Sequence, residues 1–210
     1  MAWHQAWGRH RCPSGNARGG GGRRGGETDC CRAAAILDLW APCRGVRIRR
    51  AGPGDVASLV PLVDQLHRHE GLVTGPRTEA ALRGLLTEAD LGFVLVAESR
   101  TEGGSSESPG DLAGYAVVGF GYSLEFEGRD AFVDELYVEP RYRGQGVGRQ
   151  LLGAVEAMCR DVGVRAVHLE VGHDNARALR LYERLGYQAH PRHLMTKWVG
   201  DAERVRAQPD

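Results

Sequence analysis

The sequence predicts an α/β fold organised around one mixed β-sheet, and three observations lead to this prediction. Apolar runs separated by polar turns indicate an antiparallel meander over residues 93–138. The last of these runs, 132–138, leads through a glycine-rich turn into an amphipathic helix. Another apolar run at 166–171 follows that helix, and strands joined by a helical crossover run parallel. Both kinds of strand pairing are therefore expected in one sheet.

Order is expected to begin at residue 46, with a half-buried strand over 46–49 where apolar and charged side chains alternate. A helix is predicted over 56–69 with Asp55 as its N-cap, and Pro61 inside it should kink it or tighten its first turns. A second helix is predicted over 78–87. The apolar stripe of the first helix consists of Val56, Leu59, Val60, Val63 and Leu66.

The meander begins with the run at 93–97, which is almost continuously apolar and should lie in the middle of the sheet. A long polar loop of expected mobility covers 100–111. The antiparallel partner follows at 112–124, and a turn at 127–130 leads into the central strand, 132–138.

The last part of the chain contains a helix at 176–185, which begins after Asp174 or Asn175 and ends at Gly186. Short closing strands are predicted at 187–190 and 194–199. Cys159, on the helix after the glycine turn, is expected to be a core thiol rather than a nucleophile because no paired base is evident near it.

Composition limits the classes of function. The formal net charge of zero provides no basic field for nucleic acid or an anionic membrane, and no apolar run approaches the length of a membrane span. Five cysteines without metal-ligand spacing or a secretory signal predict a reducing cytoplasm and no metal site. We therefore expect a single cytoplasmic domain over 46–199, and the sequence leaves a homodimer open.

Two terminal segments are expected to lie outside this domain. Residues 1–45 are rich in Gly and Arg and should be disordered, and 200–210 form a charged tail. A nucleic-acid-binding tail is one interpretation of 1–45, but the glycine run has no interleaved aromatic residues. An inert extension, or a start site assigned too far upstream, is the preferred interpretation.

The glycine turn is the strongest functional signal in the chain. Glycines at every second position over 143–148 let successive backbone N–H groups approach one phosphate, and the following helix adds its unpaired first-turn donors. Arg143 and Arg149 add positive charge, so a pyrophosphate fits. Neither the dinucleotide fingerprint nor a Walker motif matches this spacing. The alternative is a glycine-rich turn without a ligand.

The R-x-x-G-x-G pattern of Arg143, Gly146 and Gly148 resembles the acetyl-CoA signature of the GNAT superfamily of N-acetyltransferases. The segments 169–171 and 181–187, with Asn175 and Ala178 between them, resemble a second signature of the same superfamily. The resemblance implies a sheet splayed between the strands ending near Val138 and Val171, with acetyl-CoA in the gap. The cofactor-binding residues it implies are Leu136, Tyr137, Val138, Arg143, Gly144, Gln145, Gly146, Val147, Gly148, Arg149, Asn175 and Tyr182.

Acetyl transfer to an amine needs a base for the ammonium proton and a donor for the departing thiolate. Tyr182 is the candidate donor, with packing between helix and sheet as the alternative role. Asp134 and Glu135 are the candidate bases, only one of which should face the site because adjacent strand residues point oppositely. Glu135 is slightly favoured, Glu170 is a further candidate, and each could instead be a surface charge.

A metal site at His67, His69 and Glu70 is less favoured than a solvated helix end. The resulting hypothesis is transfer of an acetyl group from acetyl-CoA to a primary amine of a small molecule by direct attack. A protein or peptide acceptor is the second choice. A non-catalytic acetyl-CoA-binding module is an alternative from a different class.

Overall fold

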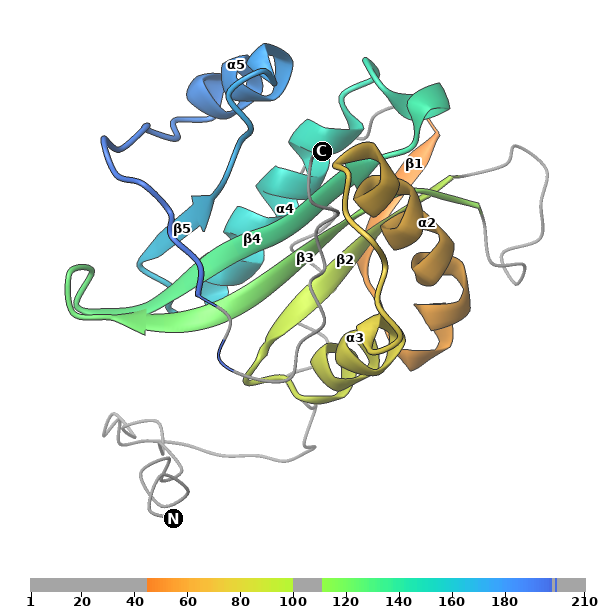
Figure 1. The fold of residues 1–210 in the computed structure, drawn as a ribbon, viewed down its shortest axis with the longest axis horizontal. Coiled ribbons are helices and arrows are strands. Elements are labelled where there is room, and N and C mark those ends of the chain that lie inside the picture. Colours follow the sequence, from red (N-terminus) through yellow and green to blue (C-terminus); the bar gives the residue numbers. More distant parts are fainter. Residues whose placement is uncertain (1–44, 100–110, 198, 200–210) are drawn as a thin grey trace, which may run out of the picture.

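A computed structural model describes residues 45–99, 111–197 and 199, and its centre is a five-stranded sheet in the order β1-β2-β3-β4-β5 (Figure 1). Neighbouring strands are antiparallel from β1 to β4, whereas β4 and β5 are parallel. The predicted mixed sheet is therefore confirmed. The strands are β1 (Val46–Arg50), β2 (Gly92–Ser99), β3 (Leu112–Ser123), β4 (Gly128–Val138) and β5 (Ala166–Leu169).

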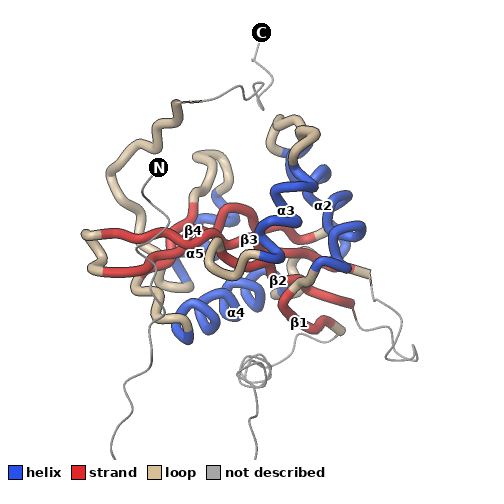
Figure 2. Tube along the Cα trace, turned by 90° about the horizontal axis from the view of Figure 1, so that it is seen from below, coloured by secondary structure: helices blue, strands red, loops and turns tan. Residues whose placement is uncertain are grey.

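Helices cover both faces of this sheet. α2 (Val56–His69) and α3 (Thr78–Thr87) lie on one face, and α4 (Val147–Asp161) lies on the other (Figure 2). α5 (Ala176–Arg184) follows β5, beside the splayed edge of the sheet (Figure 1). Short 3-10 turns, η2 (Pro53–Asp55) and η3 (Pro140–Tyr142), precede α2 and follow β4. In the part of the chain that the structure describes, no helix has the length and apolar character needed to cross a membrane.

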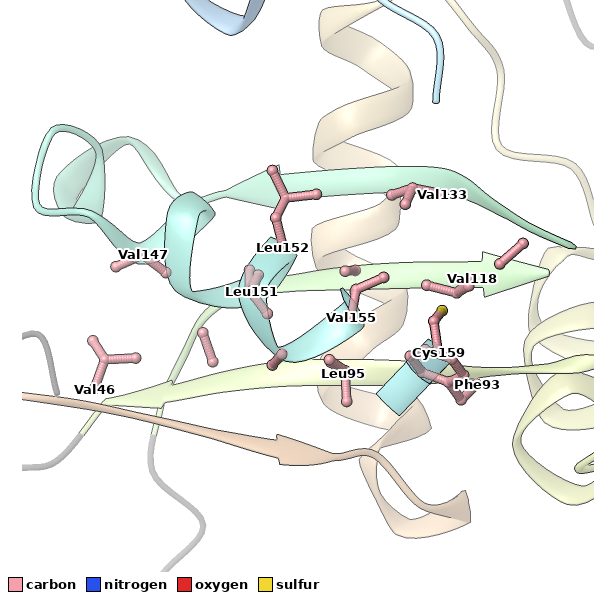
Figure 3. Close-up of a cluster of buried hydrophobic side chains, with 14 of the residues drawn as sticks. Val46, Phe93, Leu95, Val118, Val133, Val147, Leu151, Leu152, Val155 and Cys159 are labelled. Carbon is pink, nitrogen blue, oxygen red and sulfur yellow. The ribbon is translucent and has the colours of Figure 1, made fainter. Parts of the chain in front are cut away.

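The two faces of the sheet contribute to two apolar cores. Under α4, Leu95 and Val118 of the sheet pack against Leu151 and Val155 of the helix (Figure 3). Cys159 belongs to this core, where burial raises the pKa of its thiol to about 11, so the prediction of a core thiol is confirmed. The core under α2 and α3 includes Val94, Val96, Leu59, Leu66, Leu82, Tyr115 and Tyr137.

Two details of α2 differ from the prediction. The helix begins at Val56 as expected, but Asp55 makes no side-chain cap. Its carboxylate instead accepts from the Gly52 N–H at 2.8 Å and forms an ion pair with Arg49 of β1, which joins the start of the helix to the sheet. Val60 is only half-buried because Leu62 occupies the buried stripe in its place.

The bounds of several strands also differ from the predicted ones. β4 begins at Gly128, so the tight turn covers 124–127 rather than 127–130. β5 ends at Leu169 and not at 171, and no strand forms over 187–190 or 194–197, because these short stretches have no ladder partner among the described residues. The predicted loop over 100–110, the extension over 1–44 and the tail over 200–210 lie outside the described residues.

Candidate active site

The glycine turn joins the end of β4 to α4 as the sequence predicts. Gly144 and Gly146 both adopt left-handed backbone conformations, with φ of 81° and 86°. Gly146 is the N-cap of α4. A side chain at either position would strain the backbone, so glycine is required by conformation. The first-turn N–H groups of α4 have no partner within the helix, and this makes the turn suited to a phosphate.

Three arginines lie around the turn. The Arg143 Nε donates to the Val138 carbonyl at 2.8 Å, which anchors the start of the turn to the end of β4. Arg149 is exposed on the first turn of α4. The third arginine is Arg177 of α5, whose guanidinium would lie 3.5 Å from a Cβ atom added to Gly144. Arg177 was not among the predicted residues, because no local pattern in the sequence indicates that α5 approaches this turn.

Two further residues predicted to bind the cofactor are Gln145 of this turn and Gly148 at the start of α4. The Gln145 amide folds back to donate to the Arg141 carbonyl at 2.8 Å, so its side chain supports the turn. At Gly148 an added Cβ would meet Val138 and Leu181 at ordinary contact distances of 3.7 and 3.8 Å. This glycine is therefore a close-packing position rather than a conformational requirement.

The sheet is splayed where the resemblance implies. The parallel ladder between β4 and β5 covers only Asp130–Val133 against Ala166–Leu169. Leu136 and Val138 lie beyond its last pair, and they pack toward the α4 core, whereas Tyr137 points into the α2 side and donates to Gln65 at 2.9 Å. The backbone of β4 at 136–138 therefore borders the gap without a β5 partner in the described structure.

Tyr182 of α5 lies beside this gap. Its ring is 9 % exposed and packs 5.9 Å from the ring of Tyr187. Burial, and to a smaller extent the charge of Glu70 on the α2 side, raises the pKa of the Tyr182 phenol. The phenol consequently stays protonated at neutral pH and can only donate its proton. Asn175 caps α5 by accepting from the Ala178 N–H at 3.1 Å.

A β-bulge changes the arrangement of the two candidate bases. Val117 of β3 pairs with Glu135, but the next residue, Val118, pairs with Val133. Asp134 is therefore an additional residue in β4, and the strict alternation of side chains fails at this point.

Both carboxylates consequently lie on the face covered by α2 and α3. Glu135 contacts His67 of α2, and Asp134 lines a hollow of about 330 Å³ together with Ala81 and Leu85 of α3. The strict alternation behind the prediction of one site-facing carboxylate therefore fails, but of these two carboxylates only Asp134 lines the hollow, and the identity of the base stays a prediction. Burial raises the pKa of Asp134, and the negative charge of Glu135 raises it further. The charge of His67 acts in the opposite direction and lowers it.

The surroundings of the two carboxylates differ strongly. Both Glu135 oxygens are occupied: Oε2 accepts from the Tyr115 hydroxyl at 2.6 Å, and Oε1 lies 2.8 Å from the His67 Nε2. Asp134 has no hydrogen bond or ion pair within residues 45–99, 111–197 and 199, and the residue is exposed. It also lines a second, larger cleft of about 2030 Å³, which Tyr182 and the exposed Glu170 share.

His67 and Tyr115 were not identified as site residues from the sequence. His67 lies at the end of α2, where an imidazole ordinarily interacts with solvent and the helix dipole. Its contact with Glu135 spans 68 positions in the chain, so no local pattern could indicate it. Within the described residues, no three His, Cys, Asp or Glu side chains are placed to hold a metal ion.

Comparison with known proteins identifies the family. The profile of the acetyltransferase (GNAT) family matches residues 65–187. Thialysine N-epsilon-acetyltransferase of Bos taurus is 34% identical over 145 residues, which are 68% of this chain and 84% of that protein. Spermine/spermidine N(1)-acetyltransferase of Bacillus subtilis is 29% identical over 82 residues, 38% of this chain and 54% of the other.

The fold is shared with solved structures. The crystal structure of an integron cassette protein from the mobile metagenome of Cole Harbour Salt Marsh superposes with a TM-score of 0.60 at 29% identity, covering 75% of this chain and 92% of that one. The splayed mixed sheet, the glycine turn and the profile match lead to one conclusion: this chain belongs to the GNAT family of N-acetyltransferases.

Proposed function

We propose that the protein transfers the acetyl group of acetyl-CoA to a primary amine of a small cationic molecule by direct attack. The observation that supports this most is the position of Asp134. The β-bulge places it in the cleft that Tyr182 also lines, so a proton acceptor and a proton donor share one cavity beside the splayed strands. Direct transfer requires such a pair.

The residues of the turn fit the phosphates of acetyl-CoA. Gly144 and Gly146 leave their N–H groups uncovered, and Arg143, Arg149 and Arg177 surround them. The backbone of β4 at 136–138 would accompany the pantetheine arm along the gap. Acetyl-CoA supplies the thioester that carries the acetyl group. Asn175 is a weaker candidate for a pantetheine contact, because its side-chain oxygen already caps α5.

Asp134, rather than Glu135, is the residue we assign as the base. Both oxygens of Glu135 already have partners in Tyr115 and His67, so neither is free to contact an ammonium group. Asp134 has no such partner among the described residues, and its pKa is raised by burial and by the Glu135 charge. A raised pKa brings a carboxylate nearer to the basicity that removal of an ammonium proton requires. Glu170 also lines this cleft and is exposed like Asp134, but it lies beyond the end of β5, whereas Asp134 lies within β4.

Tyr182 completes the transfer by donating its phenolic proton to the departing thiolate. Its raised pKa keeps the proton on the phenol at neutral pH, so the hydroxyl can donate a hydrogen bond, and then its proton, as negative charge develops on the sulfur. In this division of roles the amine loses its proton to Asp134, its lone pair forms the new bond to the acetyl carbon, and the carbon–sulfur bond breaks.

The relatives support the choice of acceptor. Their names give thialysine and spermine or spermidine as the molecules that they acetylate, all of them small amines with a second cationic group. A small cation suits a cleft bordered by the Asp134 carboxylate. We therefore propose a free diamine or basic amino acid, and not a protein, as the acceptor.

The test is release of free CoA measured with a panel of amines, including thialysine, spermidine and a lysine-containing peptide. Asp134→Asn should lower kcat/KM for the preferred amine by about 10²–10⁴, the usual contribution of a positioned base, with less loss at high pH where the amine is already neutral. Glu170→Gln is the matched control and should remain near wild type. Wild-type kcat/KM in Asp134→Asn, or a strong loss in Glu170→Gln, would reject the assignment of the base.

A further inference from the structure

A chain of hydrogen bonds runs from α2 to the carboxylate beside the proposed base. The Thr74 hydroxyl donates to Asp64 at 2.9 Å, and the His67 Nδ1 lies 3.1 Å from the same hydroxyl oxygen. The other ring nitrogen, Nε2, lies 2.8 Å from the Glu135 carboxylate. Glu135 also accepts from Tyr115 at 2.6 Å.

The directions of these bonds determine how many protons His67 carries. The single hydroxyl proton of Thr74 is directed to Asp64, so the His67 Nδ1 must donate to the Thr74 oxygen. Burial and the charge of Glu135 raise the pKa of Tyr115 far above its usual range, so its hydroxyl stays protonated and donates to Glu135. The 2.8 Å contact between His67 and Glu135 then requires one proton between Nε2 and Oε1. That proton belongs on Nε2, because an imidazole is ordinarily more basic than a carboxylate and Tyr115 already donates to Glu135.

His67 and Glu135 are thus an imidazolium and a carboxylate in contact. Their side chains are only 12% and 18% exposed, so neither could reorient freely or exchange its partner for bulk water. The sequence neighbour of Glu135 is Asp134, which the β-bulge turns to the same face.

We propose that His67 is a positioning residue of the acetyl-transfer site, which holds Glu135 as a fixed, ionised carboxylate beside Asp134. This inference rests on the proposed function, in which Asp134 is the base. His67 and Glu135 therefore act on the pKa of Asp134 in opposite senses: the Glu135 charge raises it, and the His67 charge lowers it. The other titratable or charged groups near the pair are Asp64, Arg68, Glu70, Tyr115, Tyr137 and Tyr182.

The first measurement is the pH profile of kcat/KM in two conservative variants. His67→Gln keeps an N–H donor but removes the positive charge, so the acidic limb of the profile should move to higher pH. Glu135→Gln removes the negative charge and should move the same limb to lower pH. A side chain that only fastens α2 to the sheet would not produce two opposite displacements.

The second measurement separates position from charge. His67→Leu removes the donor and releases Glu135, and kcat should fall on the order of 10- to 100-fold, the upper value being typical of a catalytic group displaced by about 1 Å. His67→Gln should recover most of this loss. The acetyl-CoA-induced rise in Tm should persist in both. The matched controls are His69→Leu and His69→Gln, at an exposed histidine on the same helix end, which should leave kcat and the pH profile unchanged.

The third measurement does not depend on activity. Nitrogen NMR of the wild-type protein at neutral pH should show both ring nitrogens of His67 protonated, and Glu135→Gln should remove the requirement for the second proton. A neutral His67 ring in the wild type, or an unmoved acidic limb in His67→Gln, would overturn the proposal. If no amine is acetylated, the proposed function fails, whereas the NMR result still decides whether His67 and Glu135 form the ion pair.

Discussion

The glycine turn and the carboxylate pair lie at the same end of β4, yet different parts of the chain create them. The turn depends on backbone conformation, with Gly144 and Gly146 in the left-handed region and α4 starting directly after them. The surroundings of the two carboxylates, Asp134 and Glu135, depend on side chains from distant segments, because His67 of α2 lies beside Glu135 of β4. The first is therefore sensitive to a change of residue type at one position, and the second to the loss of a contact.

This difference implies unequal responses to mutation, and the largest is expected in the turn. Gly146→Val places a β-branched side chain at φ of 86° and covers the N–H groups that would face a phosphate. Acetyl-CoA should then no longer raise Tm, although a ligand specific for the native state ordinarily does.

The control for this change is Gly163→Val, at φ of 74° after the last turn of α4. It imposes similar backbone strain far from the turn and should lower Tm while leaving the acetyl-CoA shift intact. An equal acetyl-CoA shift in Gly146→Val and wild type would show that the phosphates bind elsewhere.

The next largest effect is expected at Tyr182. Tyr182→Phe keeps the packing of the ring and removes only the hydroxyl, so turnover should fall by about 10²–10⁴ while acetyl-CoA affinity changes little. Tyr187→Phe is a matched control, because the Tyr187 hydroxyl is buried and has no hydrogen-bond partner among the described residues, and its ring lies against Tyr182. Steady-state rates that are equal in the two variants would return Tyr182 to a packing role.

A smaller effect is expected for Asp134→Asn, and here the substitution should increase the stability of the protein. Because the folded state raises the pKa of this carboxyl, its contribution to stability is complete below the ordinary carboxyl pKa and is lost as pH rises through the folded value. Asp134→Asn should therefore unfold at higher denaturant than wild type at neutral pH.

The difference between the two proteins should shrink toward about pH 4, near the unfolded carboxyl pKa. Urea titrations at both pH values measure it. A variant less stable than wild type at neutral pH would contradict the raised pKa. The same substitution should lower activity, so at Asp134 stability and function are opposed.

The smallest effect is expected from deletion of residues 1–45. The segment shows no apolar period long enough to bury and so to offset the entropy of ordering, and Tm and turnover should therefore stay near wild type. A large loss of either in the shortened protein would mean that the segment contributes to the domain.

Much of the fold could be predicted from local patterns. The bounds of α2 and α3, the apolar run within β2 and the turn before α4 were predicted because each depends on residues within a few positions of one another. The closing strands at 187–190 and 194–199 were not found over the described residues, because a strand requires a partner that alternation alone does not supply. The partners of Glu135 could not be predicted for a similar reason, because His67 and Tyr115 reach it from other segments of the chain.

The sequence by itself determined the family and the glycine turn, and it supplied the candidates for proton exchange. Those features are encoded by residue type and short spacing, as in Arg143, Gly146 and Gly148. Only the tertiary structure decided which carboxylate is free. The pairing of β3 with β4 makes Asp134 a bulge residue, and His67 contacts the Glu135 carboxylate from 68 positions away in the chain. Strand pairing and helix packing depend on the whole sheet and not on neighbours in the chain.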